Sequence, residues 1–453
     1  MFMICRCMKQ RAFFMFILLI TMLPVSLLLI PDVCLAYDVS VRLVWKFPEP
    51  FWLEIEIEKG SYSLNLDRQS VELKSGDSIK IGLSTLYRFW QKGNQLQIIE
   101  KPNLSLTTLS DGVFRVREPG KEWVSYRGNL TVSAQGMGWA LINTLSEDDY
   151  LKGVVPVEMS NSWAAQGMEA LKAQAVAART YLLKNKDKNN TITDSPNIHQ
   201  AYGGKKVEGE ASLAVEATAG EILVDRDSGK PIDVFYSSHN GGHSEVTEHV
   251  WKNHDPHYLA KPDSFSLGIG GFVANWRFLI AADVLGEKFD LAPIREVKLK
   301  KYPSGRVYEV ILEDWLGNQK IISGGEFVGK FYPYNRELAR DCFLSKLFEV
   351  DFIYPLRSSD FAVRWNTFYP PNLWPQRLNN NSAGPVLARL LSSNDGLGER
   401  ERNYGVFVFS GRGWGHGVGM SQWGAYNMAL HGYSYRDILN YYYHNTSIIK
   451  LTD

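Results

Sequence analysis

The carboxylate of Glu158 is the first group in the sequence that could do chemistry. It lies in "VPVEMSNSW", residues 155–163, just before a helix-forming run. A carboxylate can act as a general acid or base when the fold holds it in place, and Pro156 together with a helix N-terminus would do so. Glu158 could instead serve only the helix dipole, but Asn161 or Ser162 can already cap that helix. We therefore take Glu158 as a candidate catalytic residue.

Two cations follow in the same run. Lys172 and Arg179 are seven residues apart, hence about 20° apart around a helix, and both lie beside its apolar stripe. Long cationic side chains commonly lie at the rim of a buried face with the charge in water. The alternative is that both face an anionic or hydroxyl-rich ligand near Glu158, so we keep both as candidate substrate-binding residues.

The stretch "GRGWGHGVGMSQWGA", residues 411–425, begins with alternating glycines. Such a backbone can approach a ligand or another segment closely. The pattern excludes a P-loop, because no Gly-Lys-Ser/Thr follows, and Ser421 lacks the final glycine of the G-x-S-x-G nucleophile elbow. One interpretation is a tight turn beneath a helix. The other is a binding wall that presents Trp414, His416 and Gln422, since aromatic rings pack well on the C–H faces of sugars.

Five histidines lie between residues 239 and 257. His239 and His243 have the i,i+4 spacing of metal ligands on a helix, but Gly241 and Gly242 interrupt any helix there, and the H-E-x-x-H pattern is absent. The sequence therefore favours a loop lined with polar residues over a zinc site. No cofactor is expected, and no metal ligand is assigned.

The sequence periodicities predict that an α+β fold positions these side chains. Residues 37–125 alternate in period two, as in "WLEIEIEKG", which predicts an N-terminal β-rich module. Residues 126–453 mix helical and strand patterns and form the expected catalytic domain. A β-rich insertion is expected within it at 264–403, where "GRVYEVILEDWLGNQKII" predicts a hairpin.

The strongest helix signal follows Glu158, and a second helical region closes the chain. The last fifty residues contain a helix that stops at Gly432, then a capping box of Ser434 with Asp437. The Pro- and Asn-rich stretch at 369–385 predicts a surface loop. The stripe expected to bury the first helix consists of Met168, Leu171, Ala175, Ala178 and Leu182.

Residues 1–36 have the features of a targeting segment. A basic stretch precedes "AFFMFILLITMLPVSLLLI", and "CLA" before Tyr37 offers a cleavage site. The segment is either cleaved as a signal peptide or kept as a membrane anchor, so an extracytoplasmic location is expected. Beyond it the chain has 46 basic and 48 acidic residues, a balance that gives no electrostatic reason to bind nucleic acid.

Seven blocks together resemble the stage II sporulation protein D family, also called SpoIID/LytB domain proteins. They run in the family's order over residues 126–449, nearly three quarters of the chain. Two long blocks, "EALKAQAVAARTY" and "GRGWGHGVGMSQWGA", are close to diagnostic. The blocks are "YRGNLTV", "EDDYLKGVVPVEM", "EALKAQAVAARTY", "ATAGEILV", "SSHNGGHSE…VW", "SGRV" and "GRGWGHGVGMSQWGA".

This resemblance implies action on bacterial peptidoglycan. Enzymes of the family are lytic transglycosylases that cleave between N-acetylmuramic acid and N-acetylglucosamine, and other members are described as amidase enhancers. Glu158 aligns with the family's catalytic glutamate, whereas Lys172, Arg179 and Ser238 fall on positions associated with holding the glycan. The expected partners are peptidoglycan strands and, as a candidate, a cell-wall amidase.

The chemistry is consistent with a single carboxylate. A hydrolysing glycosidase normally needs two carboxylates. In a lytic transglycosylase Glu158 would protonate the glycosidic oxygen and then take the proton of the muramic acid C6 hydroxyl, which attacks the anomeric carbon. The product is a 1,6-anhydro end. A non-catalytic glycan-binding protein that enhances an amidase is the alternative, and a metal-dependent hydrolase is a third, less favoured one.

The sequence departs from the family pattern at two places. The region after the catalytic helix, "TITDSPNIHQAYGG", offers Asp194 and His199 but none of the cysteines that some members tie to zinc. Many members have His-Ser where this chain has Ser237 and Ser238. A zinc site is therefore not favoured. Any role that a histidine at position 237 has in other members is in doubt here, because this chain has a serine there.

Overall fold

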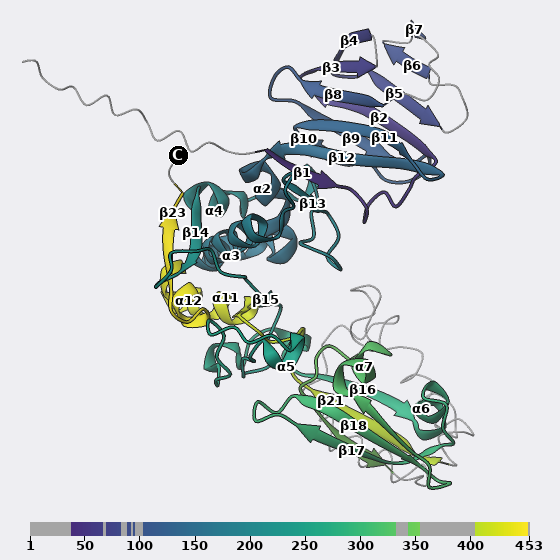
Figure 1. The fold of residues 1–453 in the computed structure, drawn as a ribbon, viewed down its shortest axis with the longest axis vertical. Coiled ribbons are helices and arrows are strands. Elements are labelled where there is room, and N and C mark those ends of the chain that lie inside the picture. The colour runs from purple at the N-terminus through teal and green to yellow at the C-terminus, as the bar shows by residue number, and fades with distance from the viewer. Residues whose placement is uncertain are drawn as a thin grey trace, which may run out of the picture. The chain divides into compact units, whose positions relative to one another are not determined.

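The computed structural model describes residues 38–66, 69–82, 88–91, 94–95, 103–331, 343–353 and 404–451. The described residues up to Lys450 belong to one compact unit. The fold is mixed α and β, as the sequence predicts (Figure 1). Two predictions, the targeting segment at 1–36 and the surface loop at 369–385, lie outside the described residues. In the described part of the chain no helix is long and apolar enough to cross a membrane.

Two antiparallel-rich sheets form the N-terminal part. One has the strand order β13-β1-β12-β11-β8-β3-β4, and the other has the order β10-β9-β2-β5-β6-β7. Their apolar faces share one core, in which Tyr62 packs edge-on against Phe114, with ring centroids 6.0 Å apart. The strands are β1 (Asp38–Arg42), β2 (Trp52–Lys59), β3 (Ser61–Leu66), β4 (Gln69–Lys74), β5 (Ser78–Gly82), β6 (Arg88–Gln91), β7 (Asn94–Gln95), β8 (Leu104–Thr108), β9 (Val113–Arg117), β10 (Val124–Arg127), β11 (Asn129–Gln135), β12 (Gly138–Ser146) and β13 (Thr191–Thr193).

The period-two pattern of the N-terminal module is confirmed, because Leu53, Ile55 and Ile57 of β2 are buried on one face. The module reaches further than residue 125, however. Strands β11 and β12 lie between β1 and β8 in the same sheet. The boundary expected at 125/126 therefore cuts through a sheet, because the long-range pairing of β1 with β12 cannot be read from local alternation.

Helix α3 (Ala164–Asn185) forms the centre of the next part (Figure 1). It contacts α2 (Glu147–Glu158), α4 (Ser212–Ala217), α11 (Gln422–Leu430), α12 (Tyr435–Tyr442) and β14 (Glu221–Asp225). The predicted stripe is confirmed for Leu171, Ala175, Ala178 and Leu182, which are fully buried. The capping box of Ser434 with Asp437 at α12 is confirmed as well.

Two strand pairs join distant parts of the chain around α3. The last strand, β23 (Thr446–Lys450), pairs with β14. The short strand β15 (Tyr236–Ser237) runs parallel to β22 (Met420–Ser421), directly before α11. Short helical turns fill the segments between these elements: η1 (Asn161–Trp163), η2 (Lys205–Val207), α5 (Glu248–Trp251), η3 (Ser264–Ser266) and η4 (Gly271–Val273).

The inserted β-rich segment has a core of its own, in which Phe327, Phe343 and Phe409 pack together. The predicted hairpin is confirmed, since β18 pairs with β19 in antiparallel fashion. Strand β21 is the middle strand of a sheet with β16 and β20, so the segment extends past residue 403. Its elements are β16 (Trp276–Ala281), α6 (Ala282–Lys288), β17 (Ile294–Lys301), β18 (Val307–Asp314), β19 (Gln319–Ser323), α7 (Gly324–Gly329), β20 (Phe348–Ile353) and β21 (Val406–Gly411).

Candidate active site

Glu158 is the last residue of α2, and the next helical turn, η1, begins three residues later at Asn161. The expected position before the following helix is thus correct, whereas the helix that ends at Glu158 was not predicted. Ser146 caps the start of α2 by accepting a hydrogen bond from the Asp149 amide, and the helix continues through Pro156. Since a helix C-terminus carries partial negative charge, the dipole does not stabilise an ionised Glu158 carboxylate.

The turn after Glu158 is also capped differently from the prediction. The Ser160 hydroxyl accepts from the Ser162 amide and so caps η1. Asn161, the expected cap, faces another segment: its side chain donates to the Val207 carbonyl at 2.9 Å and accepts from the Ala211 amide at 3.0 Å. These contacts fix the turn that separates α2 from α3.

Gln422 meets Glu158 although 264 positions separate them. The Gln422 Nε2 donates to Glu158 Oε2 at 3.2 Å and lies 3.5 Å from Gln174 Oε1. Gln422 is the first residue of α11, whose N-terminus is capped by the Ser421 hydroxyl. Both glutamines are buried, whereas Glu158 is partly exposed. The structure therefore brings two predicted site residues together, and Gln422 contacts the Glu158 carboxylate from its buried side.

Trp423 directly follows Gln422 on α11 and belongs to a cluster of three partly exposed aromatic residues, which we call the aromatic shelf: Trp163, Trp423 and Tyr426. The Trp163 ring lies 4.7 Å from Trp423 and 4.4 Å from Tyr426, stacked on the latter. None of the three is among the site residues predicted from the sequence. Their positions offered a signal, since Trp163 follows Glu158 by five residues and Trp423 follows Gln422 directly.

Two phenol groups lie close enough to Glu158 for its charge to affect their pKa values. Burial raises the pKa of Tyr181, and the negative charge of Glu158 adds to that rise. The same two causes, in the same order, raise the pKa of Tyr236 well above its ordinary value. Gln200 links the group, because its Nε2 donates to the Tyr236 hydroxyl at 2.9 Å and its Oε1 accepts from Tyr150 at 3.4 Å.

The glycine-rich loop approaches another segment of the protein closely. Trp414 and His239 exchange backbone hydrogen bonds of 2.8 and 3.1 Å. A Cβ atom on Gly417 would lie 1.9 Å from the Arg306 guanidinium, and one on Gly419 would lie 2.0 Å from the Phe235 carbonyl oxygen. Both glycines have positive φ angles, 78° and 71°. Glycine is therefore required at these positions.

His416 of this loop is held as a neutral imidazole. Burial, with the positive charges of Arg306 and Lys346, lowers the pKa of His416 to about 4. Its Nδ1 accepts from the Val418 amide at 3.0 Å, and its ring meets Trp251 edge-on. His416 is thus tied to protein groups on two sides, which is the setting of a residue that shapes the loop.

Ser238 lies beside α11, because its carbonyl oxygen accepts from the Trp423 amide at 3.1 Å. This bond connects the serine pair to the aromatic shelf. The preceding hydroxyl, that of Ser237, is buried and has no hydrogen-bond partner among the residues that the structure describes. The β15–β22 pairing thus places the Ser237–Ser238 segment beside the first turn of α11.

Arg179 is not available to a ligand. It is completely buried, and its guanidinium binds Glu147 at 2.6 Å and Asp148 at 3.0 Å. The expectation that it faces a glycan is therefore not met, because the start of α2 supplies carboxylates that the local sequence pattern could not place. Lys172 is partly exposed and pairs with Glu169 at 2.7 Å, so its ammonium group already has an acidic neighbour.

The histidines of 239–257 have separate partners. His239 accepts from the Gly241 amide, His249 pairs with Glu245, and His257 lies between Asp225 and Asp255. Within the described ranges no three His, Cys, Asp or Glu side chains are placed so that they could hold a metal ion. Asp194, considered for zinc on sequence grounds, instead accepts from the Trp45 and Lys46 amides.

Comparison with known proteins shows which family this chain resembles. Residues 135–224, which include Glu158, match the family model SpoIID, described as stage II sporulation protein. Relatives named for this family match more widely, and the resemblance predicted from the sequence is confirmed. The chain belongs to the SpoIID family.

Particular relatives extend the match beyond that segment. The chain is 30% identical to the amidase enhancer of Bacillus subtilis (strain 168) over 66% of its own length, but it spans only 40% of the length of that relative. It is 29% identical to an uncharacterized protein of Brachyspira hyodysenteriae, over 72% of this chain and 73% of that one. It is 24% identical to stage II sporulation protein D of Bacillus amyloliquefaciens, over 68% and 75%.

Proposed function

We propose that the protein is a peptidoglycan lytic transglycosylase that acts on glycan strands and leaves 1,6-anhydromuramyl ends. The observation that carries this proposal is the Glu158 carboxylate, which Gln422 contacts from within the protein beside the aromatic shelf. Membership of the SpoIID family supports the choice of a cell-wall substrate. An extracytoplasmic location follows from that substrate and from the targeting segment expected at residues 1–36.

Glu158 has two successive tasks in this reaction. As an acid it gives its proton to the glycosidic oxygen, so that the bond to the anomeric carbon breaks. As a carboxylate it then takes the proton of the muramic acid C6 hydroxyl, whose oxygen forms the new bond to the anomeric carbon. Because no water is consumed, one carboxylate is enough. The proton that Glu158 lost is restored at the end of the cycle.

The neighbouring residues have supporting tasks. Gln422 and Gln174 keep the carboxylate in one orientation, which matters because misplacement by about 1 Å can cost about 100-fold in rate. The aromatic shelf offers π faces on which the C–H faces of a sugar ring can pack. Trp414 and Ser238 are proposed to contact the strand, with Lys172 as a cation near it. His416 is proposed to hold the glycine-rich loop at the site.

The test is digestion of purified glycan strands, with and without peptides, followed by mass spectrometry. We expect 1,6-anhydromuramyl products from the natural protein and a loss of at least about 100-fold in rate for Glu158→Gln, the size of effect typical of a general acid. Glu210→Gln, at an exposed glutamate, is the matched control. Unaltered strands from the natural protein would refute the proposed activity.

A second candidate function is enhancement of a cell-wall amidase without strand cleavage. The relative named amidase enhancer favours it, and the aromatic shelf could bind glycan without reaction. The discriminating measurement is amidase activity on cell walls with Glu158→Gln present. Full enhancement by that variant, together with no anhydromuramyl product from the natural protein, would select this second function.

A further inference from the structure

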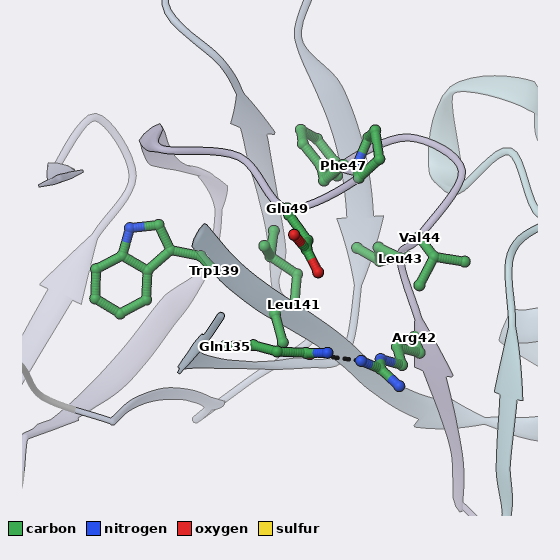
Figure 2. A pocket seen from close by; sticks show the side chains of 10 residues that line it. Arg42, Leu43, Val44, Phe47, Glu49, Gln135, Trp139 and Leu141 are labelled. Atoms are coloured by element: carbon green, nitrogen blue, oxygen red, sulfur yellow. Dashed lines mark hydrogen bonds between the residues drawn. The ribbon is translucent and has the colours of Figure 1, made fainter. Parts of the chain in front are cut away.

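A cavity of about 340 Å³ lies in the N-terminal β region, on residues that the proposed reaction does not use. Its floor is apolar, with Leu43, Phe47 and Leu141 (Figure 2). Three polar side chains, Arg42, Glu49 and Gln135, border it. The volume is at the lower end of the roughly 300 to 1,000 Å³ typical of small-ligand sites. It suits one end of a short peptide better than a glycan strand.

The two charged groups of this cavity are opposite in sign but do not pair with each other. Among the described residues, neither Arg42 nor Glu49 forms an ion pair, and the Arg42 guanidinium donates instead to the neutral amide of Gln135. In Figure 2 the Glu49 carboxylate points into the space that Arg42 and Gln135 border. A ligand with an amine near Glu49 and a carboxylate near Arg42 would complement both charges.

Glu49 is held in an unfavourable backbone conformation. Its φ angle is 51°, in the left-handed region that residues with side chains rarely adopt. Its backbone presses on β12 so closely that a Cβ atom on Gly138 would lie 2.4 Å from the Glu49 carbonyl oxygen. Local strain of this kind is kept where the surrounding structure requires it, and often marks a binding site.

The loop that carries Glu49 is fixed at both ends. The buried Asp194 carboxylate accepts from the Trp45 amide at 2.7 Å and from the Lys46 amide at 3.1 Å. Beyond Glu49, the Pro50 carbonyl oxygen accepts from the Trp139 amide at 3.1 Å. The loop is therefore a built feature of the β region, and the cavity is formed before any ligand arrives.

We propose that this cavity binds the carboxy-terminal end of a short peptide that carries a free carboxylate and a side-chain amine. Arg42 binds the carboxylate, Glu49 binds the amine, and the apolar floor takes the methyl and methylene groups between them. Stem peptides of the cell wall have this chemistry, so the identification of the source as peptidoglycan rests on the proposed function. The charge complementarity does not depend on it.

The test uses calorimetric titration of the full chain with Nα-acetyl-lysyl-D-alanine, which carries one amine and one carboxylate. We expect Arg42→Gln and Glu49→Gln each to weaken binding about tenfold, because each removes one charge-assisted contact. Lys188→Gln and Glu210→Gln remove exposed charges elsewhere and serve as matched controls. Thermal unfolding of each variant verifies that the fold is kept.

Two analogues assign each charge to its partner. With the carboxy-terminal amide, Arg42→Gln should have no further effect, whereas Glu49→Gln should still weaken binding. With the Nε-acetylated analogue, Glu49→Gln should have no further effect, whereas Arg42→Gln should still weaken binding. Equal losses for all three peptides in both variants would overturn the assignment. A natural protein that binds no peptide at about 10 mM, tenfold above the roughly 1 mM of weak specific binding, would overturn it as well.

The same preparation separates this inference from the proposed function. Strand cleavage without peptide binding would refute the peptide site and leave the transglycosylase proposal standing. Peptide binding without strand cleavage would refute the transglycosylase proposal and leave the peptide site standing. Binding of the peptide with unchanged affinity by both charge variants would show that it binds elsewhere, and would also refute the site.

Discussion

At the scale of single residues, the contact between Gln422 and Glu158 ties the proposed acid to a second element of the fold. A carboxylate at the end of a helix is free to take several rotamers unless another group restrains it. Gln422 gives that restraint from a buried position, and Gln174 contacts Gln422 in turn. The orientation of Glu158 therefore depends on residues that need not touch the substrate.

Replacement of Gln422 by Leu tests this restraint. We expect kcat for strand cleavage to fall about 10- to 100-fold, because the carboxylate loses its fixed position, while KM changes less than about threefold. Steady-state kinetics on peptide-free strands measure both values. Gln166→Leu, at an exposed position of α3, is the control. An equal loss of affinity and turnover would instead assign Gln422 to substrate binding.

Arg179 provides a prediction about stability. Arg179→Met would leave Glu147, whose side chain is 9% exposed, without its cation. Breaking a buried pair from one side costs about 3 to 5 kcal/mol, so we expect urea unfolding to show a loss of that order. Lys172→Met, at a partly exposed pair, should cost no more than about 1 kcal/mol. Similar small losses for both variants would contradict the buried role of Arg179.

At the scale of elements, the glycine-rich loop depends on close backbone approach. Gly417→Ala would place a methyl group against the Arg306 guanidinium, which donates to the Asn240 and His243 carbonyls and cannot move freely. We expect a loss of roughly 2 to 5 kcal/mol from the left-handed backbone and the overpacking together.

Gly432→Ala is the matched comparison, since its φ angle is 84° but its added Cβ would meet nothing within 4 Å. It should cost only the backbone share, about 1 to 2 kcal/mol. Chemical denaturation of both variants gives the difference. Equal losses would mean that the approach of Arg306 to Gly417 does not contribute.

The elements also show how far sequence reasoning reaches. The stripe of α3, the capping box at Ser434 and the β18–β19 hairpin follow from local periodicity and turn chemistry, and the structure has them. The end of α2 does not follow. Pro156 favours a break before it, yet burial of Val154 and Val155 outweighs that local preference. Local rules fail where tertiary packing decides.

The candidate site could likewise be predicted only in part from the sequence. Glu158 and Gln422 were selected from local patterns, the run before a helix and the glycine-rich stretch, and the family resemblance then strengthened the case for Glu158. The aromatic shelf was missed because Trp163 and Tyr426 meet only through the packing of α3 against α11. Arg179 was misplaced because the carboxylates that bury it lie on α2, and no spacing rule connects the two helices.

At the scale of the whole molecule, a buried charge cluster joins the inserted segment to the glycine-rich loop. Arg306 and Lys346 come from the insertion, Glu245 accepts from Ser304, and His416 lies in the loop. Burial lowers the pKa of Arg306 to about 10, where it still carries its charge at neutral pH. Any additional positive charge there would be repelled.

This cluster predicts a loss of stability in mild acid. The pKa of His416 is about 4 in the folded protein against an ordinary value of 6.5, so the unfolded chain takes up a proton first. Stability should therefore fall as the pH drops from 6.5 towards 4, by roughly 3 kcal/mol at most. His416→Gln should lessen this slope in urea unfolding between pH 7 and pH 5. His431→Gln, at an exposed position, should leave it as it is.

The distance in sequence between Glu158 and Gln422 has a consequence during synthesis of the protein. A ribosome delivers α2 long before α11, and domains order themselves as the chain emerges. A copy that stops short of residue 422, through premature termination or proteolysis, lacks the support of its acid and two of the three shelf aromatics. Under the proposed activity, a copy that stops before residue 422 is therefore expected to cleave glycan strands poorly.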